Sequence, residues 1–210
     1  MSCFDAETLA ALRKSVANGM SQKRFAHTLG VEECAAQMAR IYCPEQEGML
    51  RAAALLHDCT KEYAPDAAQA VLVREGITLR EDEQASPQIL HAITAPAEIQ
   101  RLYPGLATPT LLSCVRWHTT GRAGLTLCEA ILYLADVIEQ GRAYPACAHL
   151  REQFWGAAPA KMPRERALAH LCRCVLSSLC GVRDSLSAKN APVCRDTLEA
   201  IADLNLRKTL

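Results

Sequence analysis

Aromatic side chains are scarce in this sequence, at 5% of 210 residues, although hydrophobic residues as a whole make up 50%. Alanine and leucine therefore dominate the apolar set, which is typical of closely packed helices. No apolar run approaches the roughly 20 residues that a membrane span requires. Asp5 and Glu7 stand where a signal peptide would carry basic residues. We expect a cytoplasmic protein without a membrane partner.

A net charge is also lacking, because 23 lysines and arginines balance 23 aspartates and glutamates. The long-range positive field that non-specific nucleic-acid binding requires is therefore absent, and we expect no nucleic-acid partner. Any polyanionic ligand would have to be bound by a local group of cations. The glycine-rich loops of nucleotide-binding folds, GxGxxG and the Walker type, are missing too, as is the GxSxG of serine hydrolases.

The eleven cysteines include no CxxC pair, and the nearest two are Cys172 and Cys174. The odd number and irregular spacing argue against a disulfide framework and against a zinc finger. We interpret these residues as reduced thiols that fill a core as small hydrophobic side chains.

Helical periodicity covers most of the chain, and no segment has a convincing strand pattern. The sequence therefore predicts an all-α protein, a single-domain helical bundle over residues 1–210. Serine or threonine caps and prolines mark several of the boundaries, and Pro96 is expected to bend or interrupt its helix. The first expected helix carries an apolar stripe at Leu9, Leu12, Val16 and Met20 and ends near Gly19. The other expected helices are 21–43, 48–63, 64–76, 86–105, 108–121, 126–142 and, roughly, 164–187 and 191–206.

Six polar residues interrupt these apolar helices: His27, His57, Asp58, His91, His118 and Asp136. Each has a plain structural explanation when taken singly, such as a hydrogen-bonded core histidine. A buried carboxylate is costly unless it is paired or binds a metal, and one shared metal site explains all six positions at once.

Imidazole and carboxylate ligands together suit iron, manganese, zinc, cobalt or nickel. A carboxylate can bridge two cations, so Asp58 is expected to lie between two divalent metals. One side would be completed by His27, His57 and Asp136, and the other by His91 and His118.

The order of these six residues resembles the HD-domain superfamily of metal-dependent phosphohydrolases. Within it, the segments KRFAHTLGV, AALLHDCTKEY, VRWHTTGR and YLADVIEQGR are similar to the bacterial YqeK family, over about residues 20–185. That resemblance implies an HD-domain bundle with its catalytic core at 20–185 and C-terminal helices at 164–206 packed on it. It also implies symmetrical hydrolysis of diadenosine tetraphosphate to two ADP by metal-activated water, at a di-iron type centre, with manganese, cobalt or nickel as alternatives. Ala92, Val137 and Gln140 depart from the family pattern and bear on substrate fit.

The same resemblance suggests roles for polar residues near the six. Asp58, Lys61, His91 and His118 are expected to act in catalysis, and a phosphate chain is expected to meet local cations and the donors of a polar turn. Glu62 and Glu139 are expected to accept hydrogen bonds from metal-bound histidines. The expected substrate-binding residues are Lys61, Thr119, Thr120, Gly121, Arg122 and Arg142.

Two alternatives remain open at this stage. One is an HD-domain enzyme for another nucleotide or phosphoester, which the histidine set alone does not distinguish. The other is a metal-binding or nucleotide-sensing module without turnover, although the complete ligand set argues against it. The adenine pocket is expected to use Trp117, Tyr133 or Tyr144, and the apolar stretch CRCVLSSLCGV is a candidate homodimer face.

Overall fold

The structure, a computed structural model, describes residues 4–210, and all of the regular secondary structure in that range is helical. The all-α prediction is therefore confirmed. Three short 3-10 helices, η1 (Pro44–Gln46), η2 (Pro87–Ile89) and η3 (Pro159–Lys161), accompany the α-helices. The α-helices are α1 (Ala6–Ala17), α2 (Gln22–Tyr42), α3 (Glu47–Leu56), α4 (Pro65–Glu75), α5 (Glu81–Gln84), α6 (Leu90–Leu102), α7 (Pro109–Trp117), α8 (Leu127–Ile138), α9 (Pro145–Gly156), α10 (Arg164–Ser187) and α11 (Arg195–Arg207).

Side-chain caps fix where several helices begin. Asp5 accepts a hydrogen bond from the backbone N–H of Thr8 at the start of α1, and Ser21 does the same for α2. Thr126 and Glu129 form a reciprocal capping box at the start of α8. These caps matter for function because α2 and α8 carry ligand candidates, and the caps set the register in which those side chains enter the core.

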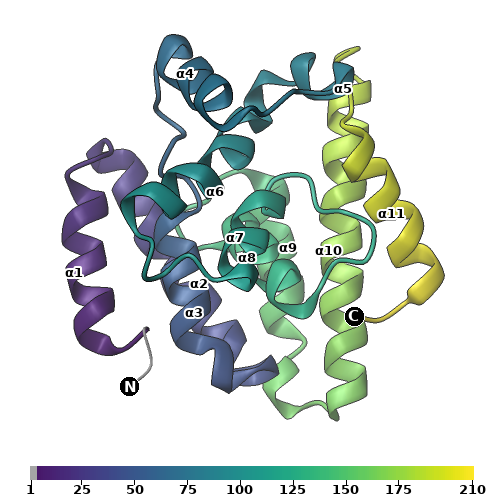
Figure 1. Ribbon diagram of the computed structural model, residues 1–210. Helices are drawn as coiled ribbons and strands as arrows, with labels where there is room; N and C mark the ends of the chain where they lie inside the picture. Colours follow the sequence, from purple (N-terminus) through teal and green to yellow (C-terminus); the bar gives the residue numbers. More distant parts are fainter. Residues whose placement is uncertain (1–3) are drawn as a thin grey trace.

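Most of the helices pack around one large apolar core (Figure 1), and Leu72, Ile89, Ile93 and Cys194 form a second, smaller cluster. Helices α2, α3, α7 and α8 occupy the centre of the large core, α1 covers one flank, and α10 with α11 covers the other. Leu50, Leu55, Ile131 and Leu132 are fully buried there. Truncating one such side chain to alanine typically costs about 2–5 kcal/mol. Within residues 4–210, no helix is both long and apolar enough to cross a membrane.

Several details differ from the sequence prediction, which did not include the short helix α5. Helix α9 was not expected, because its apolar face is narrow and buries only Leu150 and Phe154. The helix expected at 48–63 ends at Leu56, and a series of turns follows. Pro96 neither ends nor interrupts α6, since the buried Ala95 and Ile99 hold the helix in the core while one backbone hydrogen bond is lost.

The cysteines behave as expected of core thiols. All ten cysteines in the described residues are free, and six of them are buried. Burial raises the pKa of the Cys34 and Cys59 thiols to about 12, so both stay protonated at neutral pH.

Candidate metal centre

The six polar residues of the sequence prediction lie together at the ends of several helices. His57 and His118 are the residues that directly follow α3 and α7, and Asp58 comes next in the first turn. His91 stands at the start of α6, while His27 and Asp136 come from α2 and the last turn of α8. Helix C-termini carry partial negative charge. The ends of α3, α7 and α8 thus create a field that favours a cation.

The backbone fixes which ring nitrogen of His57 and His118 faces the cluster. Nδ1 of His57 lies 2.6 Å from the carbonyl oxygen of Ala54, and Nδ1 of His118 lies 2.6 Å from that of Val115. A carbonyl only accepts, so each Nδ1 carries the proton and each Nε2 presents its lone pair. Nε2 of His57 is buried without a hydrogen-bond partner. A buried nitrogen lone pair without a hydrogen-bond donor is what we expect of a side chain that binds a metal.

The carboxylate of Asp58 faces two groups of histidines with its two oxygens. Oδ1 lies 3.2 Å from Nε2 of His91 and 3.7 Å from Nε2 of His118. Oδ2 lies 3.4 Å from Nε2 of His57 and 3.9 Å from Nε2 of His27. Asp58 therefore lies between two halves of one cluster, with one carboxylate oxygen facing each half.

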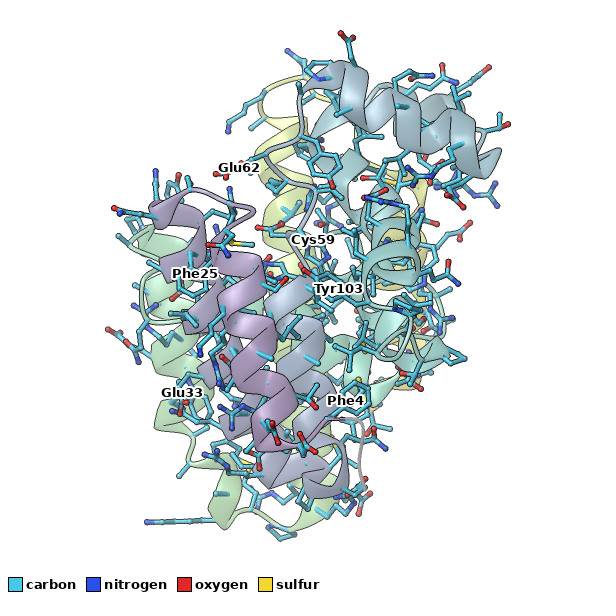
Figure 2. All side chains as sticks on the ribbon, turned by 60° about the vertical axis from the view of Figure 1, so that its left-hand side comes forward. Phe4, Phe25, Glu33, Cys59, Glu62 and Tyr103 are labelled. Carbon is cyan, nitrogen blue, oxygen red and sulfur yellow. The ribbon has the colours of Figure 1, made fainter. Side chains whose placement is uncertain are left out.

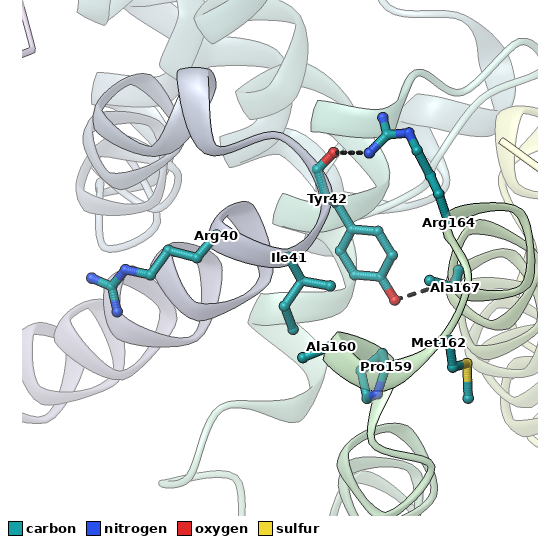
Figure 3. A pocket seen from close by; sticks show the side chains of 8 residues that line it. All are labelled: Arg40, Ile41, Tyr42, Pro159, Ala160, Met162, Arg164 and Ala167. Carbon is teal, nitrogen blue, oxygen red and sulfur yellow. Dashed lines mark hydrogen bonds between the residues drawn. The ribbon is translucent and has the colours of Figure 1, made fainter.

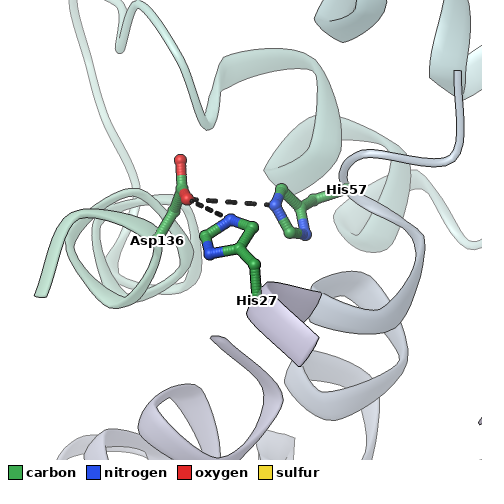
Figure 4. Close-up of side chains that lie close together, drawn as sticks. All are labelled: His27, His57 and Asp136. Atoms are coloured by element: carbon green, nitrogen blue, oxygen red, sulfur yellow. Dashed lines mark ion pairs between the residues drawn. The ribbon is translucent and has the colours of Figure 1, made fainter. Parts of the chain in front are cut away.

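Figure 4 shows one of these halves, formed by His27, His57 and Asp136. Nε2 of His27 lies 2.9 Å from Oδ1 of Asp136, and Nε2 of His57 lies 3.9 Å from the same oxygen. Nδ1 of His27 donates to Oε1 of Glu139 over 3.1 Å. Glu139 thus orients the ring of His27 so that Nε2 points at the cluster, as a supporting carboxylate does for a metal-bound histidine.

The electrostatics of the cluster fit a bound cation. Burial lowers the pKa of His91 to about 4, so its ring is neutral at pH 7 and able to act as a ligand. Burial opposes protonation of His27 as well, but the hydrogen bonds to Asp136 and Glu139 raise its pKa to about 9. A divalent metal competes with that proton for the same lone pair. The donor set of four imidazoles and two carboxylates matches iron, manganese, cobalt, nickel or zinc.

Lys61 and Thr119 border the His91 side of the cluster. Nζ of Lys61 lies 3.1 Å from Nδ1 of His91 and donates to the carbonyl oxygen of Gln88 over 3.3 Å. The hydroxyl of Thr119 lies 3.1 Å from Nε2 of His118. Both side chains are thus within reach of an anion held at the cluster.

Arg24 also contacts the cluster, and the sequence analysis did not identify it. Its Nη1 donates to Oδ2 of Asp58 over 2.5 Å, and its Nε is buried without a hydrogen-bond partner, 4.0 Å from Oε1 of Glu62. Arg24 precedes His27 by three residues on α2, so both lie on one helix face. The spacing of Arg24 and His27 is the sequence signal for this contact, and it is informative only when the fold is known to place Asp58 opposite α2.

Arg142 lies at the edge of the half that Figure 4 shows. Its Nε donates to the backbone carbonyl of Asp136 over 2.9 Å, and its Nη2 donates to the carboxylate of the same residue. Nη2 is also 3.5 Å from Nε2 of His27. Nη1 makes no hydrogen bond to another residue within the described part of the chain, which leaves it free to donate to a ligand.

Three residues expected to bind substrate have their contacts elsewhere. Arg122 pairs with Glu129 of α8 over 3.0 Å. The hydroxyl of Thr120 donates to the carbonyl of Gly121, and the carbonyl of Thr120 accepts from Thr197. A Cβ added at Gly121 would contact α10 and α11, and its φ of 64° suits glycine. These residues hold the loop after α7 against the C-terminal helices.

Glu62, the other expected partner of a histidine, caps α2 instead. Its carboxylate accepts hydrogen bonds from the backbone N–H and the hydroxyl of Ser21, each over 2.7 Å. Its side chain is 39% exposed, at the edge of the molecule above Phe25 (Figure 2). Glu62 therefore acts on the register of α2, which carries Arg24 and His27, without a contact of its own to the histidines.

Of the aromatic residues considered for adenine, Tyr133 and Trp117 make their side-chain contacts with residues outside the six. Tyr133 is buried in the core, and its hydroxyl lies 3.0 Å from that of Ser178. Trp117 packs against the guanidinium of Arg116, whose Cζ lies 4.1 Å from the centroid of the Trp117 ring. Tyr144 is 70% exposed and precedes α9.

Known proteins similar to this chain include three named as symmetrical bis(5'-nucleosyl)-tetraphosphatases. The protein from Halalkalibacterium halodurans is 30% identical over 90% of this chain and 92% of its own length. The one from Bacillus subtilis is 27% identical over 91% of this chain and 92% of its own. The Staphylococcus aureus protein is 30% identical over 65% of this chain and 69% of its own.

A solved structure and a family model agree with that similarity. The crystal structure of a predicted HD superfamily hydrolase, described as involved in NAD metabolism, from Clostridium acetobutylicum has a TM-score of 0.79 and 26% identity. The match covers 94% of this chain and 97% of that one. The HD domain family model matches residues 24–141, a stretch that contains all six clustered residues. These matches confirm the resemblance seen in the sequence, and this chain belongs to the HD domain family.

Proposed function

We propose that this protein hydrolyses diadenosine tetraphosphate symmetrically, releasing two molecules of ADP, in a metal-dependent reaction. The observation that carries the proposal is Asp58, whose two oxygens face separate groups of histidines. The activity named for the three relatives supports the choice of substrate.

Two divalent metals would be held by the six clustered residues. Asp58 would be shared, with His27, His57 and Asp136 completing one site, and His91 and His118, which both face Oδ1 of Asp58, completing the other. Bound there, the metals lower the pKa of water so that a nucleophile exists at neutral pH, and they neutralise charge on phosphate oxygens. We propose iron as the native metal, with manganese, cobalt or nickel as substitutes, since these ligands suit all four.

The chain's own side chains supply the remaining chemistry. Lys61 and Arg142 place positive charge on two sides of the cluster, and Arg24 adds a third cation beside Asp58. Charges fixed in a partly buried site stabilise the developing negative charge of a phosphoryl transition state without reorganising. The hydroxyl of Thr119 is placed to donate to a phosphate oxygen on the His118 side.

Symmetrical cleavage sets the register of the substrate. Water forms a bond to one of the two inner phosphorus atoms, and the bond from that phosphorus to the central bridging oxygen breaks. The proton of water is released, and ADP leaves on each side. The site must therefore grip one nucleoside diphosphate unit, so that its terminal phosphorus lies at the cluster.

Product analysis tests the proposal. Protein purified without oxygen and assayed for metal is incubated with diadenosine tetraphosphate, and the products are separated by chromatography. ADP as the sole nucleotide product supports symmetrical hydrolysis. ATP with AMP contradicts the proposed register, and hydrolysis of a different phosphoester in place of this substrate contradicts the proposed specificity. Bound metal without turnover on any nucleotide would favour a sensor module.

Three further points belong to the proposal. The ten free cysteines of residues 4–210 support a reducing, cytoplasmic location. The substrate is a small molecule, and the near balance of charges supports the absence of a nucleic-acid partner. A homodimer remains a prediction, as do the core boundaries at 20–185 and the C-terminal helices at 164–206.

A further inference from the structure

Arg151 of α9 binds the backbone of the turn that follows α8. Its Nη1 donates to the carbonyl oxygen of Glu139 over 2.7 Å and to that of Arg142 over 3.2 Å. Within residues 4–210 this guanidinium, which is partly buried, forms no ion pair with a carboxylate. A charged side chain whose hydrogen bonds go to two carbonyl groups of one turn acts on the position of that turn.

The turn depends on a donor from outside. Glu139 directly follows α8, and its backbone, with φ of −57° and ψ of 154°, leads the chain out of the helix. Carbonyl groups at the end of a helix lack partners within it. The carbonyl of Glu139 also accepts from the backbone N–H of Arg142 over 3.1 Å. The carbonyl of Arg142, by contrast, accepts from Arg151 alone in the part of the chain that the structure describes.

The two residues that Arg151 holds are those whose side chains extend from this turn to the metal centre. The carboxylate of Glu139 lies 3.1 Å from Nδ1 of His27, and the guanidinium of Arg142 donates to a carboxylate of the centre. Glu139 is restrained a second time by the N–H of Gly141. The backbone carbonyl of Arg142 has no such second restraint, so the direction of this side chain depends more on Arg151 than that of Glu139 does.

Helix α9 fixes Arg151 relative to α8. Leu150 and Phe154 are the buried residues of α9, and they attach it to the core. Arg151 directly follows Leu150, so its backbone is held at this attachment. The helix that the sequence pattern did not predict therefore has a role at the metal centre, because it supplies a donor to the turn after α8.

Arg164 makes a bond of the same kind far from the centre. Its Nη1 donates to the carbonyl oxygen of Tyr42, the last residue of α2, over 3.0 Å, beside a hollow of about 230 Å³ (Figure 3). Along α2, Tyr42 is roughly 22 Å from His27 at a rise of 1.5 Å per residue. Loss of the Arg164 bond is therefore expected to change stability without changing the metal centre.

We propose that Arg151 is a positioning residue, which holds the turn at 139–142 so that the guanidinium of Arg142 stays beside the metal centre. The inference rests on the proposed function and names the residue that orients one of its cations. A cation already in place when a phosphate arrives does not have to be ordered on binding, which raises affinity. Arg151 acts through Arg142 and need not touch the substrate.

The test removes the two bonds of Arg151 and measures phosphate binding. Arg151→Gln is too short to reach both carbonyl groups, whereas Arg151→Lys keeps a charged donor and is the conservative variant. Arg142→Gln is made alone and combined with each of them, and Arg164→Gln is the matched control. The affinity of Mn²⁺-loaded protein for pyrophosphate is measured by titration calorimetry, together with metal content and melting temperature.

Arg151→Gln is expected to weaken pyrophosphate binding by about tenfold with metal content unchanged, and Arg151→Lys by about threefold. Added to Arg142→Gln, neither change is expected to weaken binding further, because residues that act through one contact are not additive. Arg164→Gln is expected to keep full affinity even where its melting temperature falls.

Three results would each overturn the inference: full affinity in the Arg151 variants, the same loss repeated on top of Arg142→Gln, or an equal loss in Arg164→Gln. If Arg151→Gln does not fold, Arg151→Lys and its combination with Arg142→Gln decide the question alone. The proposed function is judged separately, by whether the unaltered protein converts diadenosine tetraphosphate to ADP.

Discussion

Glu139 holds His27 in place across a sequence separation of 112 residues, with its Oε1 lying 3.1 Å from Nδ1 of the imidazole. The carboxylate also accepts a hydrogen bond from the backbone N–H of Gly141. It stands just beyond α8, where it is buried, so it supports His27 from the side opposite to Asp136. The metal centre therefore depends on a residue that need not touch the metal.

Glu139→Gln is expected to lower metal affinity by about 10–100-fold, because the amide is a weaker partner for the Nδ1–H of His27. Glu33→Gln serves as the control, since Glu33 is exposed on α2 and contacts Gln37, not a histidine. Titration of the metal-free variants with Mn²⁺ checks both. Equal affinities for the two variants would contradict the role given to Glu139.

Gly30→Ala tests the space around Glu139. Glycine inside a helix normally costs about 1 kcal/mol relative to alanine. Helix propensity alone would therefore make Gly30→Ala a stabilising substitution. A Cβ at this position would collide with the Glu139 carboxylate, which is buried and held by two hydrogen bonds. We expect Gly30→Ala to lower both the melting temperature and the metal affinity. Gly181→Ala, where the Cβ meets open space, is expected to raise the melting temperature, and a rise for both variants would contradict the argument.

Arg24→Gln is expected to raise the KM for diadenosine tetraphosphate by about tenfold with metal content unchanged. The reason is that Arg24 places a guanidinium beside Asp58 without being a metal ligand. Arg122→Gln is the comparison, because Arg122 is paired with Glu129 over 3.0 Å and contacts no residue of the cluster in the described part of the chain. Steady-state kinetics on protein of known metal content measures the KM of each variant. A larger KM increase for Arg122→Gln would restore Arg122 as the main phosphate contact.

That the six residues lie together could be predicted from sequence, because a shared metal site accounts for all of them at once. Histidines and aspartates are unexpected inside apolar helices, so their positions stand out without knowledge of the fold. Arg24 could not be found in this way, since an arginine near the start of a helix is usually solvated and its partner lies 34 residues away. The roles expected of Thr120 and Gly121 rested on their closeness to His118 in sequence, whereas the loop after α7 packs against α10 and α11.

The helices, too, include some that the sequence predicts and some that it does not. Where a serine or threonine cap marks the start, the prediction was close: both ends of α2 and the start of α8 lie within one residue of it, whereas α8 ends four residues earlier than expected. Helix α9 lacked that signal, although Pro145 occupies its first position. The end of α3 at Leu56 depends on tertiary contacts, including the hydrogen bond from Thr60 to the carbonyl of His91. Such contacts leave no periodic pattern in the sequence.

Glu98 is expected to govern part of the acid stability. It accepts hydrogen bonds from Arg101, Arg74 and Tyr63, and these partners, Arg101 foremost, lower its pKa to about 2. Because its pKa is lower in the folded than in the unfolded protein, its contribution is complete above the ordinary value of 4.5 and is lost as the pH falls towards about 2.

The variant Glu98→Gln should therefore be less stable than the unaltered protein by about 1–2 kcal/mol at pH 7. The difference in unfolding free energy is expected to narrow as the pH falls from 5 to 3. Urea denaturation at several pH values measures it. A difference that stays constant across this range would show that the loss has another cause.

We propose that Asp58 joins two metals in one hydrolytic site, and metal content measured together with turnover is the sharpest test of this. Protein purified without oxygen is analysed for bound metal and for ADP release from diadenosine tetraphosphate, and Asp58→Ala and His57→Ala are compared with Asp184→Asn, an exposed control. For the unaltered protein we expect about two metals per chain and ADP as the sole product. Asp58→Ala and His57→Ala are expected to lose metal and turnover together, and Asp184→Asn is expected to change neither. Full activity of Asp58→Ala, or turnover by metal-free protein, would contradict the proposal.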